Sequence, residues 1–171
     1  MPLTLLALLL AALEPQSCDM PIAERTRQLA LGYEAFDEAS APYGWRDLSA
    51  RGCTDAAVAL LRAYRSAHLG KLTVEQKRES AFHIGQTYAF ANRRPDALRS
   101  FIAADAEDAP EEWRAYVAAH IAFFRHDEAW LADARRRYAA VSGPGSMRLK
   151  FIDGFVKCPD KSYMEAAHCA M

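Results

Sequence analysis

Apolar side chains recur at intervals of three and four residues along most of this chain, which is the spacing of one face of an α-helix. The first such stripe covers residues 21 to 38, where Ile22, Leu29, Tyr33 and Phe36 fall on one face. The sequence has no run in which β-branched residues alternate with polar ones, the usual sign of a strand. The pattern therefore predicts an all-α protein.

Turn and capping signals divide the rest of the chain into further helices. Trp45 begins a short helix that Gly52 ends, and Thr54 stands where the N-cap of the next helix is expected. Thr73 and Gln76 have the spacing of a capping box, in which each side chain binds the backbone amide of the other residue. This box is expected to open the longest helix of the protein.

The second half of the chain predicts helices in the same way. The longest helix is expected to run to about Asn92, and residues 110 to 124 are apolar on nearly every side, which predicts the most buried helix. Ser146 caps a later helix, and Asp160 or Ser162 opens a short final one. In all, about seven or eight helices are expected after the N-terminal apolar segment.

Residues 81 to 110 have a spacing that is more specific than helical periodicity. The positions that carry it are Ile84, Gly85 and Tyr88 on a first helix, and Ala97, Phe101 and Ala104 on a second. This segment resembles the helical hairpin of the tetratricopeptide repeat, whose pattern is W-x2-L-G-x2-Y, then A-x3-F and a proline. Ala81 replaces the tryptophan of that pattern, and Pro110 comes one residue later than usual.

The resemblance implies a tetratricopeptide-like superhelix of antiparallel helical hairpins. Gly85 and Ala97 are small enough for two helices to approach closely there, while Tyr88 and Phe101 fill the space beside them. A solitary hairpin would leave an apolar face in water, so further helices must flank it. We expect a single helical domain that spans residues 18 to 171.

The first thirteen residues, MPLTLLALLLAAL, are apolar around the whole circumference of a helix. They are too few to span a bilayer, which takes about 20 residues, and we interpret residues 1 to 17 as a secretory signal peptide. This interpretation predicts a periplasmic or secreted protein. Two alternatives stay open, namely a helix buried in the core of a cytoplasmic protein and an uncleaved leader that holds the protein at a membrane.

Four cysteines follow this segment: Cys18, Cys53, Cys158 and Cys169. An even number of cysteines agrees with an oxidising compartment. Pairing Cys18 with Cys53 and Cys158 with Cys169 is the most economical arrangement, although four cysteines allow three connectivities. Reduced thiols are expected instead if the N-terminal segment is retained in a cytoplasmic protein.

In proteins of the tetratricopeptide type, the first helices line a concave face that binds an extended peptide or a partner segment. Transferred by position, the resemblance implies a groove formed by Glu79, Phe82, His83, Gln86, Phe90, Tyr116 and His120. Aromatic and hydrogen-bonding side chains together suit a recognition surface. For Phe90 and Tyr116, packing in the core of a closed helical bundle is the alternative, because aromatic rings dominate cores as well as interfaces.

Charge and motif spacing narrow the function classes. The formal net charge of −1 suggests neither nucleic acid nor an anionic membrane surface as a partner. His83 and His120 belong to separate helices, and the sequence has neither H-E-x-x-H nor C-x2-C spacing, so no catalytic residue, metal ligand or cofactor is assigned. We expect a non-catalytic scaffold that binds a protein or peptide. A small-ligand-binding protein, or an enzyme whose site forms between helices, is the alternative.

Overall fold

The structure is a computed structural model that describes residues 17–38, 42–143 and 145–171. Within these residues it contains ten α-helices and no strand, which confirms the predicted all-α class. No helix in this part of the chain is both long and apolar enough to cross a membrane. Apart from Ser17, the predicted signal peptide lies outside the described residues and stays a prediction.

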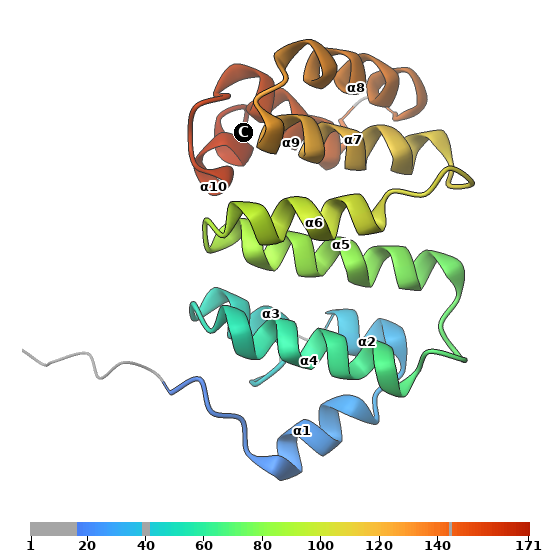
Figure 1. The fold of residues 1–171 in the computed structure, drawn as a ribbon, viewed down its shortest axis with the longest axis vertical. Coiled ribbons are helices and arrows are strands. Elements are labelled where there is room, and N and C mark those ends of the chain that lie inside the picture. The colour runs from blue at the N-terminus through green and yellow to red at the C-terminus, as the bar shows by residue number, and fades with distance from the viewer. Residues whose placement is uncertain (1–16, 39–41, 144) are drawn as a thin grey trace, which may run out of the picture.

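The ten helices follow one another with short connections. In chain order they are α1 (Ile22–Leu29), α2 (Tyr33–Glu38), α3 (Trp45–Ala50), α4 (Thr54–Ala67), α5 (Val74–Phe90), α6 (Arg94–Ala104), α7 (Glu111–Arg125), α8 (Glu128–Val141), α9 (Met147–Lys157) and α10 (Tyr163–His168). Helices α3 and α4, α5 and α6, α7 and α8, and α9 and α10 pack as pairs, and each pair contacts the next. Figure 1 shows the pairs stacked in layers, with α1 at one end of the stack and α8 to α10 at the other.

Side-chain caps begin several helices at the predicted residues. The Thr73 hydroxyl accepts a hydrogen bond from the Gln76 amide N–H at 3.2 Å, and the Gln76 side-chain oxygen accepts one from the Thr73 N–H at 3.0 Å. The hydroxyl groups of Ser146 and Ser162 likewise accept backbone hydrogen bonds at the starts of α9 and α10. These bonds satisfy amide groups that have no partner within their own helix.

The prediction of one continuous helix over residues 21 to 38 is wrong, because the chain breaks between α1 and α2. Two side chains, one in α4 and one directly after it, bind carbonyl groups at the break. The Tyr64 hydroxyl donates to the Leu31 carbonyl oxygen at 2.9 Å, and His68 Nε2 lies 2.8 Å from the Leu29 carbonyl oxygen. They satisfy carbonyl groups that the end of α1 leaves without helical partners, and the break adds a helix to the expected number.

Two helix ends differ from their predicted positions. Cys53, not Thr54, occupies the N-cap position of α4, and no side chain caps that end. Cys53 is held there by its disulfide bond to Cys18. Helix α5 ends at Phe90, before the expected Asn92, which adopts a left-handed conformation with a φ of 56°.

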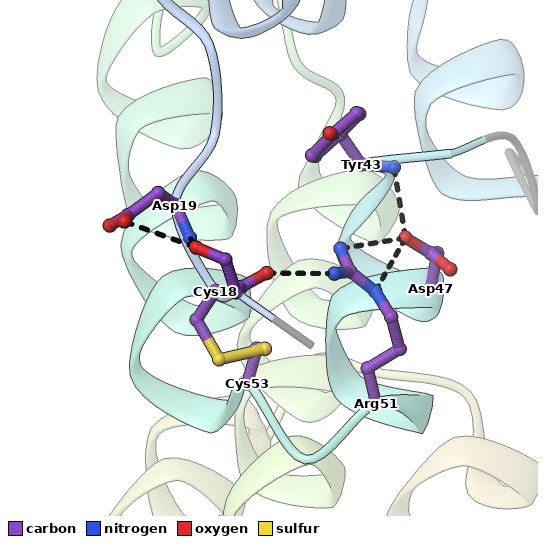
Figure 2. The surroundings of a disulfide bond; sticks show 7 residues. Cys18, Asp19, Tyr43, Asp47, Arg51 and Cys53 are labelled. Atoms are coloured by element: carbon purple, nitrogen blue, oxygen red, sulfur yellow. Dashed lines mark hydrogen bonds and ion pairs between the residues drawn. A yellow bond between two sulfur atoms is a disulfide. The ribbon is translucent and has the colours of Figure 1, made fainter. Parts of the chain in front are cut away.

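Both predicted disulfide pairings are confirmed. Cys18 is bonded to Cys53 and Cys158 to Cys169, with Cα atoms 5.3 Å and 6.4 Å apart. Figure 2 shows a second tie beside the first disulfide, where the Arg51 side chain donates a hydrogen bond at 3.0 Å to the backbone carbonyl group just before Cys18. The two disulfides are consistent with an extracellular or periplasmic location.

The core is centred on α7, in which all residues from 115 to 124 are buried, as predicted for the most buried helix. Gly85 of α5 faces the ring of Phe101 on α6 so closely that a Cβ atom at position 85 would lie 2.8 Å from ring carbons. Ala97 is fully buried in the same hairpin. The small residues therefore allow the close contact between α5 and α6 that their spacing predicted.

Candidate functional site

An open, mainly apolar pocket with a volume of about 460 Å³ lies where α3, the C-terminal end of α5 and α10 meet. Trp45, Arg46 and Ser49 line it from α3, Phe90 lines it from α5, and Met164 lines it from α10. Phe90 and Met164 are 41% and 42% exposed to solvent. Neighbouring exposed apolar side chains of this kind mark sites of interaction. We refer to this site as the α3–α5–α10 pocket.

Trp45 lies at the buried side of the pocket lining, where only 2% of its surface is exposed. Its ring stacks on that of His83 with centroids 4.9 Å apart, and the Arg46 guanidinium lies 4.1 Å from the indole centroid. These stacking and cation–π contacts hold the indole plane in one orientation. The indole N–H is buried without a hydrogen-bond partner in the described part of the chain, which is unusual for a buried donor.

Asp37 connects the two side chains that flank Trp45. Its carboxylate lies 2.9 Å from Arg46 Nη2 and 2.8 Å from His83 Nδ1, although the latter contact does not meet hydrogen-bond geometry. Burial favours the neutral form of Asp37, but contact with His83 and the charge of Arg46 outweigh it and lower the pKa of the carboxyl group. Asp37 is therefore a charged group that positions both neighbours.

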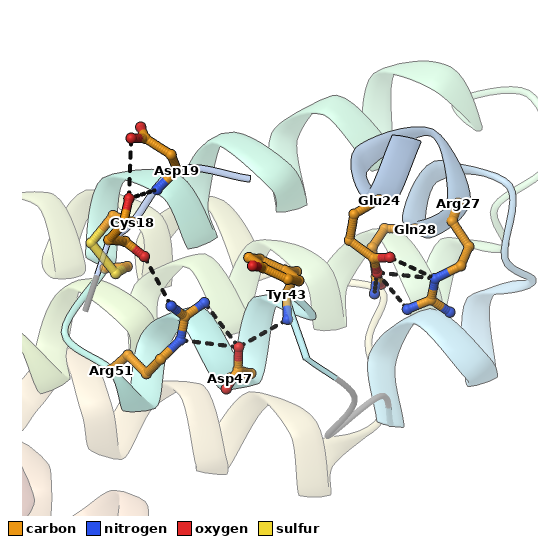
Figure 3. A network of polar contacts seen from close by, with 10 residues as sticks. Cys18, Asp19, Glu24, Arg27, Gln28, Tyr43, Asp47 and Arg51 are labelled. Atoms are coloured by element: carbon orange, nitrogen blue, oxygen red, sulfur yellow. Dashed lines mark hydrogen bonds and ion pairs between the residues drawn. A yellow bond between two sulfur atoms is a disulfide. The ribbon is translucent and has the colours of Figure 1, made fainter. Parts of the chain in front are cut away.

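Helix α3 is anchored by a second polar network (Figure 3). The Asp47 carboxylate accepts hydrogen bonds from the Tyr43 amide N–H at 2.9 Å and from Arg51 Nε at 3.1 Å. Arg51 also forms the contact to the N-terminal segment beside the first disulfide. Asp47 thus ties α3 to Tyr43, which precedes the helix, and to Arg51, which follows it.

Helix α10 forms the opposite wall of the pocket and is held by close packing on α9. Gly154 lies so close to α10 that a Cβ atom there would be 2.2 Å from the Ala166 carbonyl oxygen. Tyr163 is buried, with its ring centroid 5.5 Å from that of Phe90 and 5.3 Å from that of Phe155. The disulfide Cys158–Cys169 also links the end of α9 to the end of α10.

Four of the predicted groove residues remain at least partly accessible along α5: Glu79, His83, Gln86 and Phe90. Phe90 lines the pocket, and His83 lies against its tryptophan. Glu79 accepts a hydrogen bond from the Tyr33 hydroxyl at 3.2 Å. Of the four, only Phe90 is a lining residue of the pocket; His83 contacts it through Trp45, and Glu79 and Gln86 are not part of the lining.

The other three predicted groove residues, Phe82, Tyr116 and His120, are buried in the core. The Phe82 ring centroid lies 5.2 Å from that of Tyr116 and 4.8 Å from that of His120. In this conformation they cannot contact a partner, so the predicted continuation of the groove across α7 is not formed. For Tyr116, packing in the core is the alternative that agrees with the structure.

His120 is fully enclosed by aromatic rings. Its Nδ1 lies 2.8 Å from the Tyr116 carbonyl oxygen, while its Nε2 is buried without a partner among the described residues. Burial lowers the pKa of His120 to about 4, since the bond to the Tyr116 carbonyl only partly opposes it and the charge of Arg148 lowers it further. His120 is therefore a neutral core residue near pH 7.

Sequence reasoning did not assign Trp45, Arg46, Ser49 or Met164 to a site. They belong to α3 and α10, which have six residues each and are too short to show a clear amphipathic pattern. Nothing in the sequence brings these distant segments together. The one usable signal was the adjacent tryptophan and arginine at the start of a predicted helix, a combination typical of interfaces.

No three histidine, cysteine, aspartate or glutamate side chains among residues 17–38, 42–143 and 145–171 come close enough to hold a metal ion. The chain matches no family model, no curated protein and no solved structure. The resemblance of residues 81 to 110 to a tetratricopeptide repeat therefore stays a prediction.

Proposed function

We propose that the protein is a non-catalytic binding protein whose α3–α5–α10 pocket receives a large apolar side chain of a protein or peptide partner. The observation that carries this proposal is the convergence of Trp45, Phe90 and Met164 from three helices on one open pocket. Aromatic and methionine side chains next to an arginine have the composition of protein interfaces. The proposal treats the α5–α6 hairpin as a tetratricopeptide-like unit and places the protein in the periplasm or outside the cell.

The shape of the pocket favours a segment of a larger partner. Its volume of about 460 Å³ is within the usual range for binding sites, but it is open to solvent. An open site of this size can hold one or two side chains of a partner polypeptide, while the rest of the partner lies outside the pocket. Arg46 lines the pocket, and its side chain is 42% exposed. Asp37 binds only some of the N–H groups of the Arg46 guanidinium. The free N–H groups are suited to a carboxylate or carbonyl group of the partner.

Selection from a displayed library of short random peptides tests this proposal. The wild-type protein is expected to enrich peptides that combine a large apolar residue with a nearby acidic one. Binding of a synthetic selected peptide should weaken at least about tenfold in the double variant Phe90→Gln, Met164→Gln, because central apolar contacts carry most of the binding energy of an interface. Arg46→Gln should weaken the peptides with an acidic residue most.

Ile102→Gln combined with Met147→Gln is the matched control, since these apolar side chains are 45% and 55% exposed but do not line the pocket. The control should bind the peptide as the wild type does. Equal affinity of the wild type and the pocket variant would refute the assignment of the site. A library that yields no enriched peptide with the folded wild type would refute peptide binding itself.

A further inference from the structure

A second pocket, with a volume of about 260 Å³, lies where α4, α5 and α6 meet. Arg62 and Arg65 line it from α4, and Arg99 lines it from α6. Asp96 is the acidic residue of the lining, so three positive charges face one negative charge. This site, which we call the arginine pocket, shares no lining residue with the α3–α5–α10 pocket.

The arginines of this pocket are unequally paired. Asp96 forms ion pairs with Arg99 and with Arg93, which lies just outside the lining. Among the described residues, no carboxylate forms an ion pair with Arg62 or Arg65, in contrast to the arginines around them. The lining therefore keeps two positive charges that Asp96 does not balance.

Arg65 is held in a costly position. It is half-buried, and it lies one turn from Arg62 on the same helix, where like charges repel each other. Burial lowers the pKa of the Arg65 guanidinium, and the charge of Arg62 lowers it as well, while Tyr33 acts in the opposite direction. Charged groups that lose solvent are normally paired, so the partly buried Arg65 is a favourable contact for an anionic ligand.

Apart from Ser100, the rest of the lining is apolar. The largely buried Ala81, Ile84 and Tyr88 of α5 and the exposed Ala103 of α6 contribute to it. The guanidinium carbon of Arg62 lies 6.0 Å from the Tyr88 ring centroid, a cation–π contact that helps to orient this side chain. An anionic group at the arginines would thus have room for a small apolar group beside it.

We propose that the arginine pocket binds a small phosphate monoester, with its phosphate group held by Arg62, Arg65 and Arg99 and its organic group against Ala81 and Ile84. Two uncompensated positive charges match a phosphate monoester, which carries a charge of about −1.5 to −2 near pH 7. Guanidinium groups that come from two helices can bind several oxygen atoms of a tetrahedral anion, and their planar donor arrays fit phosphate well. This function is separate from peptide binding at the α3–α5–α10 pocket.

Isothermal titration calorimetry of the full chain with phenyl phosphate, at constant ionic strength, tests the proposal. The wild type is expected to bind phenyl phosphate more tightly than inorganic phosphate, which lacks the apolar group, and more tightly than benzoate, which lacks the second charge. In the double variant Arg62→Gln, Arg65→Gln, the affinity for phenyl phosphate should fall at least about tenfold, as expected when charge-assisted hydrogen bonds are removed. Without ligand, this variant should melt no lower than the wild type, because the repulsion between the two arginines is gone.

The matched control is Arg25→Gln with Arg136→Gln, which removes the same charge from exposed positions. It should bind phenyl phosphate as the wild type does. Equal weakening in the two double variants would overturn the proposal, since it would indicate a general effect of net charge. Equal affinity for inorganic phosphate and phenyl phosphate would overturn the assignment of the organic group, and the absence of any binding heat in the wild type would overturn the site.

Discussion

At the residue scale, two histidines on neighbouring helices have opposite surroundings. His83 lies next to Asp37 and Trp45, at the edge of the α3–α5–α10 pocket. His120 is enclosed by the core, and its imidazole cannot reach solvent without local opening. Of the two, only His83 is placed where it can respond to a bound partner.

The burial of His120 predicts a specific loss of stability in acid. Above pH 6.5 the imidazole is neutral in the folded and the unfolded chain, so it adds no pH dependence. Between pH 6.5 and about 4, the unfolded chain binds a proton that the folded chain does not, so the free energy of unfolding falls as the pH is lowered. The full loss from this residue is roughly 3 kcal/mol.

Urea unfolding of the wild type and of His120→Leu, at about pH 7 and about pH 4.5, measures this effect. Between the two pH values, the free energy of unfolding should fall less in the variant than in the wild type, by most of the roughly 3 kcal/mol. Carboxylates also titrate in this range, but both proteins have the same carboxylates, so their effect cancels in the comparison. His126→Gln, at an exposed position, is the control and should decline as the wild type does. Parallel declines in the wild type and His120→Leu would contradict the prediction.

Gly85 predicts a second effect at this scale. In Gly85→Ala the new methyl group would lie 2.8 Å from the ring of Phe101, which is fully buried and has little room to move. We expect a net loss of roughly 1 to 2 kcal/mol in the free energy of unfolding, since overpacking outweighs the gain in helix propensity. Chemical denaturation measures it. Gly70→Ala, which meets no atom within 4 Å, should leave stability nearly unchanged, and an equal loss in both variants would exclude the proposed clash.

At the element scale, local signals determined most of the helices. The capping box at Thr73 and the serine caps of α9 and α10 depend on neighbours in sequence, so the sequence was enough to predict them. The break after α1 depends instead on Tyr64 of α4 and on His68 directly after it, which bind the carbonyl groups there. Such tertiary contacts override helical periodicity and cannot be read from the local pattern.

The candidate site was predictable in part for the same reason. The spacing of α5 placed His83 and Phe90 on one accessible side of the helix, and the structure brings Phe90 into the pocket lining and His83 against Trp45. The opposite walls come from α3 and α10, whose positions depend on packing between distant segments. The burial of His120 likewise results from helices that close over α7, which periodicity alone does not reveal.

The contact between α9 and α10 predicts how the pocket can be opened. In Gly154→Ala the new methyl group would lie 2.2 Å from the Ala166 carbonyl oxygen and 3.1 Å from that of Ala167. These are backbone atoms, so α10 as a whole must move. We expect faster hydrogen exchange in residues 163 to 168 and weaker binding at the α3–α5–α10 pocket, while the other helices stay protected.

Hydrogen–deuterium exchange with mass spectrometry measures this effect. Gly143→Ala, where an added methyl group meets no atom within 4 Å, is the control and should leave exchange in α10 unchanged. Normal protection of α10 in Gly154→Ala would show that the contact with α9 does not hold the helix in place.

At the scale of the whole molecule, the two disulfides lie at opposite ends of the stack of helices. Cys18–Cys53 ties the N-terminal segment to the start of α4, and Cys158–Cys169 ties the end of α9 to the end of α10. Between them, the α5–α6 and α7–α8 hairpins are held by aromatic packing, as in the contacts of Phe101 with Phe82 and His120. Each disulfide therefore holds a terminal segment of the chain to a helix of the stack.

This arrangement predicts that folding depends on an oxidising compartment. The disulfides join residues 35 and 11 positions apart, so their loss should cost about 4 and about 3 kcal/mol through the entropy of the unfolded chain. The sum is comparable to the total stability of an ordinary domain, about 5 to 15 kcal/mol. Urea unfolding of Cys18→Ala, Cys53→Ala and of Cys158→Ala, Cys169→Ala measures each loss, after intact mass confirms the remaining disulfide. We expect the loss of Cys18–Cys53 to lower the free energy of unfolding more than the loss of Cys158–Cys169. If the fully reduced protein were as stable as the oxidised protein, folding would not depend on an oxidising compartment.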